Sequence, residues 1–182
     1  MIARSGFLQS GHPSIDLTWT VRYRNVKPIE TLRKESDLHS WIIEQGMTVS
    51  RRPNSDDLKQ FKQLREAIFG ALSLAIAGEP PTPTQIRIIN KNASFSPYQP
   101  FLNSSGTIRF KHDGTGYESA RSIVARDAIE LLALKDGRLR VCARPDCALL
   151  FYDSSRPGSR KWCAAERCGN IVNTKAYRSR RN

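Results

Sequence analysis

The stretch CARPDC at residues 142–147, followed after fifteen residues by CAAERC at residues 163–168, decides the fold of the C-terminal part of this chain. Each stretch begins and ends with cysteine, so two pairs with the same internal gap are separated by an interval long enough for a hairpin. Thiolate pairs in this arrangement are typical of a closed tetrahedral metal site, to which each pair contributes two ligands. The spacing therefore predicts one structural zinc ion, held by Cys142, Cys147, Cys163 and Cys168.

The alternatives to a metal site are two disulfides or four unrelated thiols. Disulfides are disfavoured because the N-terminal sequence shows no apolar stretch of an export signal, so we expect a cytoplasmic protein. Chance is disfavoured because the 141 residues before Cys142 contain no cysteine. Iron in the same four-thiolate site stays open. A catalytic zinc usually has a His or carboxylate ligand, but no histidine lies close to the cysteines in sequence: the three are His12, His39 and His112.

The positive charge of the chain is concentrated in the same segment. The 182 residues include 29 Lys and Arg against 17 Asp and Glu, a formal net charge of +12. Residues 138–182 alone carry eleven basic and three acidic side chains. This excess favours polyanionic partners, and a segment so short and charged rarely folds by packing alone. We therefore expect zinc binding to contribute folding free energy, on the order of 10 kcal/mol for such sites.

The residues around the cysteine pairs predict a treble-clef-like zinc finger with four cysteine ligands. Residues 138–141 and 149–152 are typical of short strands, and residues 154–159 are typical of a loop. After Cys163 the pattern becomes helical, which places the second pair at a helix N-terminus, where backbone N–H groups favour thiolate charge.

One edge of this helix is predicted to be basic and suited to phosphate groups. The same edge begins at Ile171 and passes through Lys175 and Arg178. The alternative to phosphate binding is that the terminal run of arginines is only a solvated tail. The residues predicted to bind nucleic acid are Arg160, Lys161, Lys175, Arg178, Arg180 and Arg181.

Helical periodicity dominates the sequence before the finger. Apolar residues recur at the spacing of a buried helix face in residues 36–46, 55–78 and 117–137. A shorter helix is expected at residues 84–90. Residues 15–21 fit either a strand or a helix, and we favour a helix.

A small hairpin is expected between the helix at residues 84–90 and the helix at residues 117–137. Residues 107–111 alternate in polarity, and Asp113 and Gly114 indicate a turn. The predicted fold class is therefore α+β, with a mainly helical N-terminal domain and hairpin at residues 1–137 and the finger at residues 138–182.

Several motifs resemble a known bacterial family. The motifs FYD at residues 151–153, RKWC at 160–163 and CGN at 168–170, followed by a basic helix, are similar to the CGNR-type zinc finger. The upstream part is similar to the ABATE domain that usually precedes this finger, through an Asp16-Leu17 segment and LREAI at residues 64–68.

The resemblance implies a regulator of stress-induced transcription whose finger binds zinc through the four cysteines and also binds DNA. The sequence departs from the family at two positions. Ile171 stands where the name-giving motif has arginine, which removes one cation from the predicted phosphate-binding edge. Trp19 stands where the family often has asparagine before threonine, so the resemblance does not carry over a ligand role for the N-terminal domain at this position.

Two hypotheses from different classes follow. In the first, the chain is a non-enzymatic transcription regulator whose finger binds double-stranded DNA mainly through phosphates, while the N-terminal domain senses an unidentified effector or mediates homo-oligomerisation. In the second, zinc stabilises a protein-interaction module whose basic helix docks on an acidic partner. An enzyme is not expected, because the sequence shows no nucleotide-binding glycine fingerprint, nucleophile elbow or His-Glu-x-x-His motif. No apolar run is long enough to span a membrane.

Overall fold

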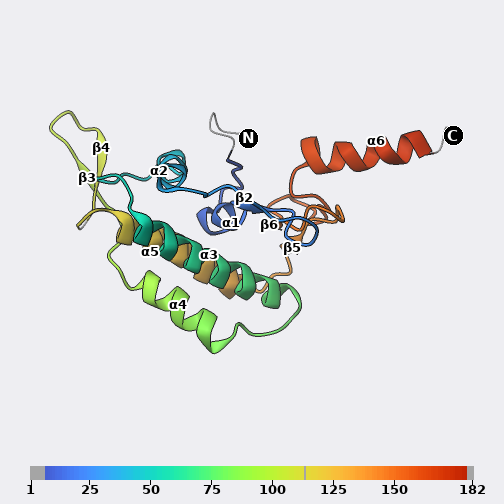
Figure 1. Cartoon of the computed structure of the whole chain (residues 1–182), viewed down its shortest axis with the longest axis horizontal. Coiled ribbons are helices and arrows are strands. Elements are labelled where there is room, and N and C mark those ends of the chain that lie inside the picture. The colour runs from blue at the N-terminus through green and yellow to red at the C-terminus, as the bar shows by residue number, and fades with distance from the viewer. Residues whose placement is uncertain (1–6, 113, 180–182) are drawn as a thin grey trace.

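Two long helices packed against each other form the centre of the molecule (Figure 1). The computed structural model describes residues 7–112 and 114–179, with the backbone alone described for residues 175–179. The helices are α1 (Pro13–Thr18), α2 (Glu35–Glu44), α3 (Ser55–Ile76), α4 (Pro83–Ala93), α5 (Tyr117–Leu134), the π-helical turn η1 (Ala165–Gly169) and α6 (Asn170–Ser179). The strands form three antiparallel pairs: β1 (Val21–Arg22) with β2 (Ile29–Glu30), β3 (Gln99–Leu102) with β4 (Ile108–Lys111), and β5 (Leu139–Val141) with β6 (Leu150–Tyr152).

The sequence of α3 shows why a helix begins and packs where it does. The side chain of Asn54 accepts a hydrogen bond from the backbone N–H of Asp57 at 2.9 Å, and the Asp57 carboxylate accepts one from the backbone N–H of Asn54 at 2.9 Å. Along the helix, Phe61, Leu64 and Leu72 are buried at helical spacing. Helices α2, α3, α4 and α5 occupy the segments predicted from the sequence. Helix α1 confirms the helix that was favoured over a strand at the start of residues 15–21.

The hairpin was predicted in the right region but with the wrong turn. Strands β3 and β4 are joined by residues 103–107, and not by a turn at Asp113 and Gly114, the first of which lies outside the described residues. The side chain of Asn103 makes this turn by accepting hydrogen bonds from the backbone N–H groups of Ser105 and Thr107 at 3.1 and 2.9 Å. Figure 1 shows the hairpin projecting from one end of the molecule, away from α6.

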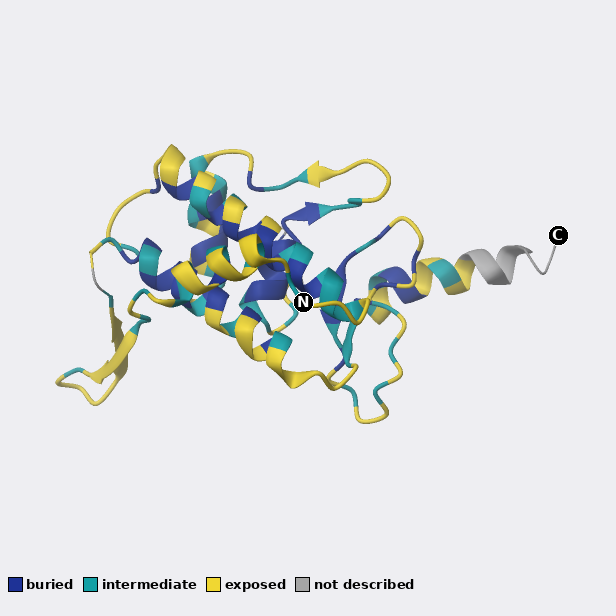
Figure 2. Cartoon of the chain, turned by 90° about the horizontal axis from the view of Figure 1, so that it is seen from below, coloured by how far each residue is buried: buried dark blue, intermediate teal, exposed yellow. Residues whose placement is uncertain are grey.

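The C-terminal segment packs on the helices. We call residues 13–134 the helical part and residues 138–179 the finger; the predicted division after residue 137 falls between α5 and β5. Leu150 and Phe151 of β6, together with the four cysteines, belong to the same buried cluster as the core of the helical part. Figure 2 shows buried segments both in the packed helices and where the chain leads into α6. The predicted strands at β5 and β6 and the helix that follows the second cysteine pair are confirmed, and α6 extends away from the body. Among the described helices, none is both long and apolar enough to cross a bilayer.

Candidate metal centre

The first two cysteines are positioned by the β5–β6 hairpin. Cys142 follows β5 directly, and its backbone N–H donates to the carbonyl of Leu149 at 2.8 Å. Cys147 lies in the turn, where its N–H donates to the carbonyl of Arg144 at 2.9 Å. Ala148 then takes a left-handed conformation with φ of 52°, which leads the chain into β6. Backbone hydrogen bonds and turn geometry therefore bring both sulfurs to the same end of the hairpin.

The other two cysteines come from the start of the C-terminal helix. Cys163 precedes η1, and Cys168 lies within η1, where its N–H donates to the carbonyl of Ala164 at 2.9 Å. Trp162 packs against this turn so closely that a Cβ on Gly169 would come within 3.0 Å of its ring carbon Cδ1. A side chain at position 169 would therefore require the indole to shift by a few tenths of an ångström.

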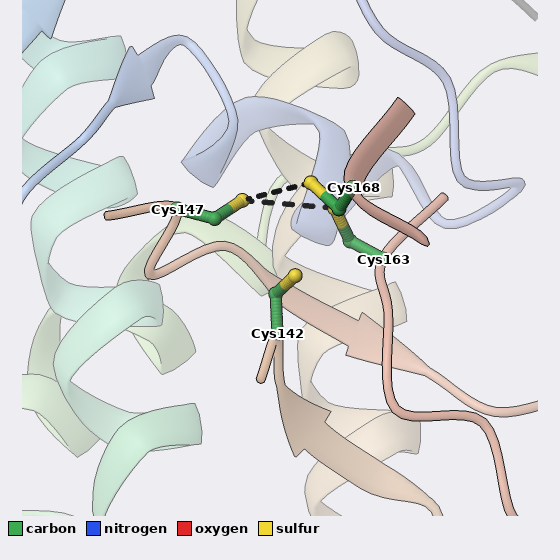
Figure 3. A group of neighbouring side chains, drawn as sticks. All are labelled: Cys142, Cys147, Cys163 and Cys168. Carbon is green, nitrogen blue, oxygen red and sulfur yellow. Dashed lines mark hydrogen bonds between the residues drawn. The ribbon is translucent and has the colours of Figure 1, made fainter. Parts of the chain in front are cut away.

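All four sulfurs converge on one point (Figure 3). The Sγ atoms of the four cysteines lie within 4.8 Å of one another. The Cys147–Cys163 distance is 3.7 Å, and the Cys163–Cys168 and Cys147–Cys168 distances are 3.6 Å. Zinc–sulfur bonds of about 2.3 Å at tetrahedral angles separate two sulfurs by about 3.8 Å. The three distances among Cys147, Cys163 and Cys168 are therefore close to the edges of a tetrahedron of sulfurs around one zinc ion, and Cys142 lies near enough to be the fourth ligand. All four cysteines are free, and these distances are too long for a disulfide bond.

The chemistry of the four side chains also fits a metal ion. Each cysteine is at most 5% exposed. The pKa of Cys163 is raised to about 12, mainly by its hydrogen bond with Cys142, and further by burial and by the charges of neighbouring sulfurs. Four buried sulfurs this close together are all ionised only around a cation that compensates their charge. With four buried sulfur ligands and no open position, the chain holds one structural zinc ion.

Two arginines surround the sulfurs with positive charge. The guanidinium of Arg167 donates to the Sγ atom of Cys163 at 3.6 Å. Arg144 is 7% exposed, pairs with Asp146 at 2.7 Å, and lies over the ring of Tyr23 at 5.6 Å. The sequence analysis did not assign these two residues a role, although both lie inside the cysteine stretches.

The Asp153 carboxylate fixes the loop between the two halves of the site. Its Oδ1 atom accepts hydrogen bonds from the backbone and side chain of Ser155 at 3.0 and 2.6 Å, and its Oδ2 atom accepts one from the backbone N–H of Arg160 at 2.7 Å. Although burial raises its pKa, these hydrogen bonds outweigh burial and lower the pKa to about 2. Asp153 therefore stays ionised and holds the loop that ends at Cys163.

The finger is tied to the helical part by Trp19. Its indole N–H donates to the backbone carbonyl of Leu150 at 2.6 Å, and the side chain is 5% exposed. A second contact runs from the Asn25 side chain to the carbonyl of Pro145 at 2.6 Å. The residue that departs from the family pattern thus makes a structural contact between two parts of the chain.

The residues predicted to bind nucleic acid differ in their surroundings. The guanidinium of Arg160 donates to the backbone carbonyl of Cys163 at 3.0 Å and lies over the ring of Phe151 at 5.4 Å, so it stabilises the finger itself. Lys161 is exposed. Lys175 and Arg178 lie on α6, whereas Arg180 and Arg181 lie outside the described residues.

Two family models match the chain. ABATE, described as a putative stress-induced transcription regulator, matches residues 11–134, and the CGNR zinc finger matches residues 138–181. Both matches confirm the resemblance seen in the motifs. A comparison with curated proteins found no match.

Proposed function

Because the chain belongs to the ABATE family and carries a CGNR zinc finger after its ABATE domain, we propose that it regulates transcription by binding double-stranded DNA through the finger. The proposal is carried by the placement of α6, which begins at the zinc centre and extends away from the body (Figure 1). A helix that begins at a metal site and extends away from the body is suited to lie along a DNA groove.

The charge of the finger supports contacts to phosphate groups. The net excess of eight basic side chains in residues 138–182 is carried partly by α6, on Lys175 and Arg178, and partly by Arg180 and Arg181 after it. Ile171 is 39% exposed on the first turn of α6, at the position where the family motif has arginine. The remaining cations would therefore supply most of the affinity, together with Lys161. Arg160 is proposed to contribute mainly by holding the finger together.

The role proposed for the helical part is to sense an effector or to mediate homo-oligomerisation. The hydrogen bond from Trp19 to Leu150 joins the helical part directly to β6. A conformational change in α1 would therefore be transmitted to the finger. We propose no catalytic role for the chain, and we propose that it acts in the cytoplasm.

The test is a fluorescence anisotropy titration of zinc-loaded full-length protein with duplex DNA. We expect affinity to fall with a log–log salt slope of about −4, because four or five phosphates are neutralised. Reversal of two charges, with Arg178→Glu and Arg181→Glu together, should nearly abolish binding. The matched control reverses two exposed cations of α4, Arg87 and Lys91, and should bind like the unmodified chain. If the finger variant binds DNA as tightly as the control, the proposed face is wrong and a protein-interaction role for the finger is favoured.

A further inference from the structure

A cavity of about 430 Å³ opens on the helical part, and none of its lining residues belongs to the finger. Its walls come from the segment before α1, from α1 itself, from the end of α2, and from Tyr98, Phe110 and Ile123. The volume is within the range of about 300–1,000 Å³ that is usual for small-molecule sites. The cavity is therefore large enough for a small organic ligand.

Two carboxylates, those of Asp16 and Glu44, line this cavity. Asp16 of α1 is 3% exposed, and its Oδ1 atom accepts a hydrogen bond from the backbone N–H of Ser10 at 2.5 Å. Glu44, the last residue of α2, lines the cavity too. In the described part of the chain, neither carboxylate forms an ion pair with a lysine or arginine. A buried carboxylate without a counterion is costly, so a cation that enters the cavity would be stabilised.

Glu44 supplies a second, independent sign of a missing partner. Its Oε2 atom is buried and has no hydrogen-bond partner within the described residues. Buried polar atoms without a partner are uncommon in folded proteins. Burial raises the pKa of Glu44, and burial raises the pKa of Asp16 to about 6. The last turn of α2 contains no basic residue, so the partial negative charge at its C-terminus also favours a cation.

The remaining walls are uncharged, and they combine the polar residues Gln9, Gln45 and Thr48 with apolar and aromatic side chains. No lining residue is a lysine or arginine, although the chain has 29 of them. Met47, Tyr98 and Phe110 face the same cavity, and the hydroxyl of Tyr98 donates to the backbone carbonyl of Thr48 at 2.5 Å, which fixes its ring. Aromatic rings attract organic cations, whereas Mg²⁺ and Ca²⁺ prefer six or more oxygen ligands. These walls therefore favour an organic cation over a metal ion.

We propose that this cavity binds a small organic ammonium ion, with Asp16 and Glu44 around the ammonium group and Met47, Tyr98 and Phe110 against its apolar body. The site gives chemical content to the sensing role proposed for the helical part and rests on it for its biological meaning. Binding of the amine is independent of DNA, however, so the two proposals fail separately. The short helix α1 links this site to the finger, because Trp19 follows it and donates to Leu150.

The experiment is isothermal titration calorimetry on zinc-loaded full-length protein at about pH 7.5, where Asp16 is ionised. The probe is 2-phenylethylammonium, and 2-phenylethanol is the uncharged comparison with the same apolar body. We expect the ammonium ion to bind about tenfold or more tightly than the alcohol. Asp16→Asn and Glu44→Gln should each weaken binding of the ammonium ion about tenfold, because each removes one of the two negative charges.

The matched control is Glu79→Gln, which removes an exposed carboxylate outside this cavity and should leave affinity unchanged. If Asp16→Asn does not fold, Phe110→Ala keeps the test, because Phe110 is 50% exposed and its loss should weaken binding severalfold without opening the core. The proposal is overturned by equal binding of amine and alcohol, by undiminished binding in the carboxylate variants, or by no binding of the amine up to about 10 mM. Displacement of the amine by Mg²⁺ would also overturn it, since that result would indicate a metal-ion site.

Discussion

The helical part and the finger obtain their stability in different ways. The helical part buries long apolar faces, such as Phe61, Leu64 and Leu72 on α3, so its core is built from many contacts of similar size. The finger buries few apolar side chains and gathers four sulfurs within 4.8 Å of one another. We therefore expect the loss of one sulfur atom to destabilise the finger as much as the loss of a whole buried side chain destabilises the helical part.

The two parts nevertheless share one buried cluster. Leu150 and Phe151 of the finger pack with the core of the helical part, and the indole of Trp19 hydrogen-bonds to β6. The finger therefore depends on the metal for its own fold and on Trp19 for its place. Predictions that separate these two dependences test the comparison directly.

The largest effect is expected from loss of the metal. Cys163→Ser, or removal of zinc by a chelator, should unfold β5, β6 and η1, since zinc supplies folding free energy on the order of 10 kcal/mol. Hydrogen exchange should show loss of protection in the finger, whereas α3 and α5 stay protected. The control is Ala143→Ser at an exposed position next to Cys142. Unchanged protection of β5 and β6 in the zinc-free protein would contradict the role of the metal.

A smaller effect is expected at the junction of the two parts. Trp19→Ala removes a buried side chain and should lower the free energy of unfolding by about 3–5 kcal/mol. Trp19→Phe keeps most of the packing but leaves the carbonyl of Leu150 without its donor, for a cost of about 1–3 kcal/mol. Urea unfolding of the zinc-loaded protein measures both. Equal stability of Trp19→Phe and the unmodified chain would mean that the hydrogen bond does not hold the finger.

The difference between the two parts also explains what the sequence could predict. The metal ligands were readable because cysteine pairs at a fixed spacing indicate a site whatever packs around them. The helices of the helical part were readable from their periodicity. Two features could not be predicted: the contact of Trp19 with Leu150, and the cavity beside Asp16. Both bring together residues that are far apart in the chain, and local sequence patterns do not predict such contacts. The hairpin turn was misplaced because the hydrogen bonds of the Asn103 side chain decide it, rather than the Asp-Gly pair.

Asp16 is the counterpart in the helical part of the buried thiols, since it is ionisable and buried but pairs with no lysine or arginine among the described residues. Burial raises its pKa from 3.8 to about 6, against hydrogen bonds from Ser10 and Gln45 that lower it. The folded state therefore binds more protons than the unfolded state between about pH 4 and pH 6, so stability falls as pH rises through this window. The shift corresponds to a free energy of about 3 kcal/mol at most.

Asp16→Asn should remove this dependence, because asparagine keeps an oxygen to accept the Ser10 hydrogen bond but does not titrate. The measurement is the difference in unfolding free energy between the two proteins from pH 4 to pH 8. His12 also titrates nearby: its hydrogen bond with Asp127 raises its pKa, and its charge interacts with Asp16 and Glu130. The loss of zinc at acid pH affects both proteins alike and cancels in the difference. The difference therefore reports Asp16 together with its charge interaction with His12. A difference independent of pH would contradict the raised pKa.

The smallest effect should come from a residue that tunes the metal site without holding it. Arg167→Gln removes the N–H group that donates to Cys163 Sγ and one positive charge beside four thiolates. We expect zinc affinity to fall about tenfold, as for other partners of metal ligands, while circular dichroism of the zinc-loaded protein stays unchanged. Competition with a chelator measures the affinity, and Arg156→Gln, at an exposed position of the finger loop, makes the same change in charge as a control. If both variants lose zinc affinity equally, net charge alone would explain the effect. If only Arg167→Gln loses affinity, the finger depends on individual hydrogen bonds to sulfur, whereas the core of the helical part depends on many contacts of similar size.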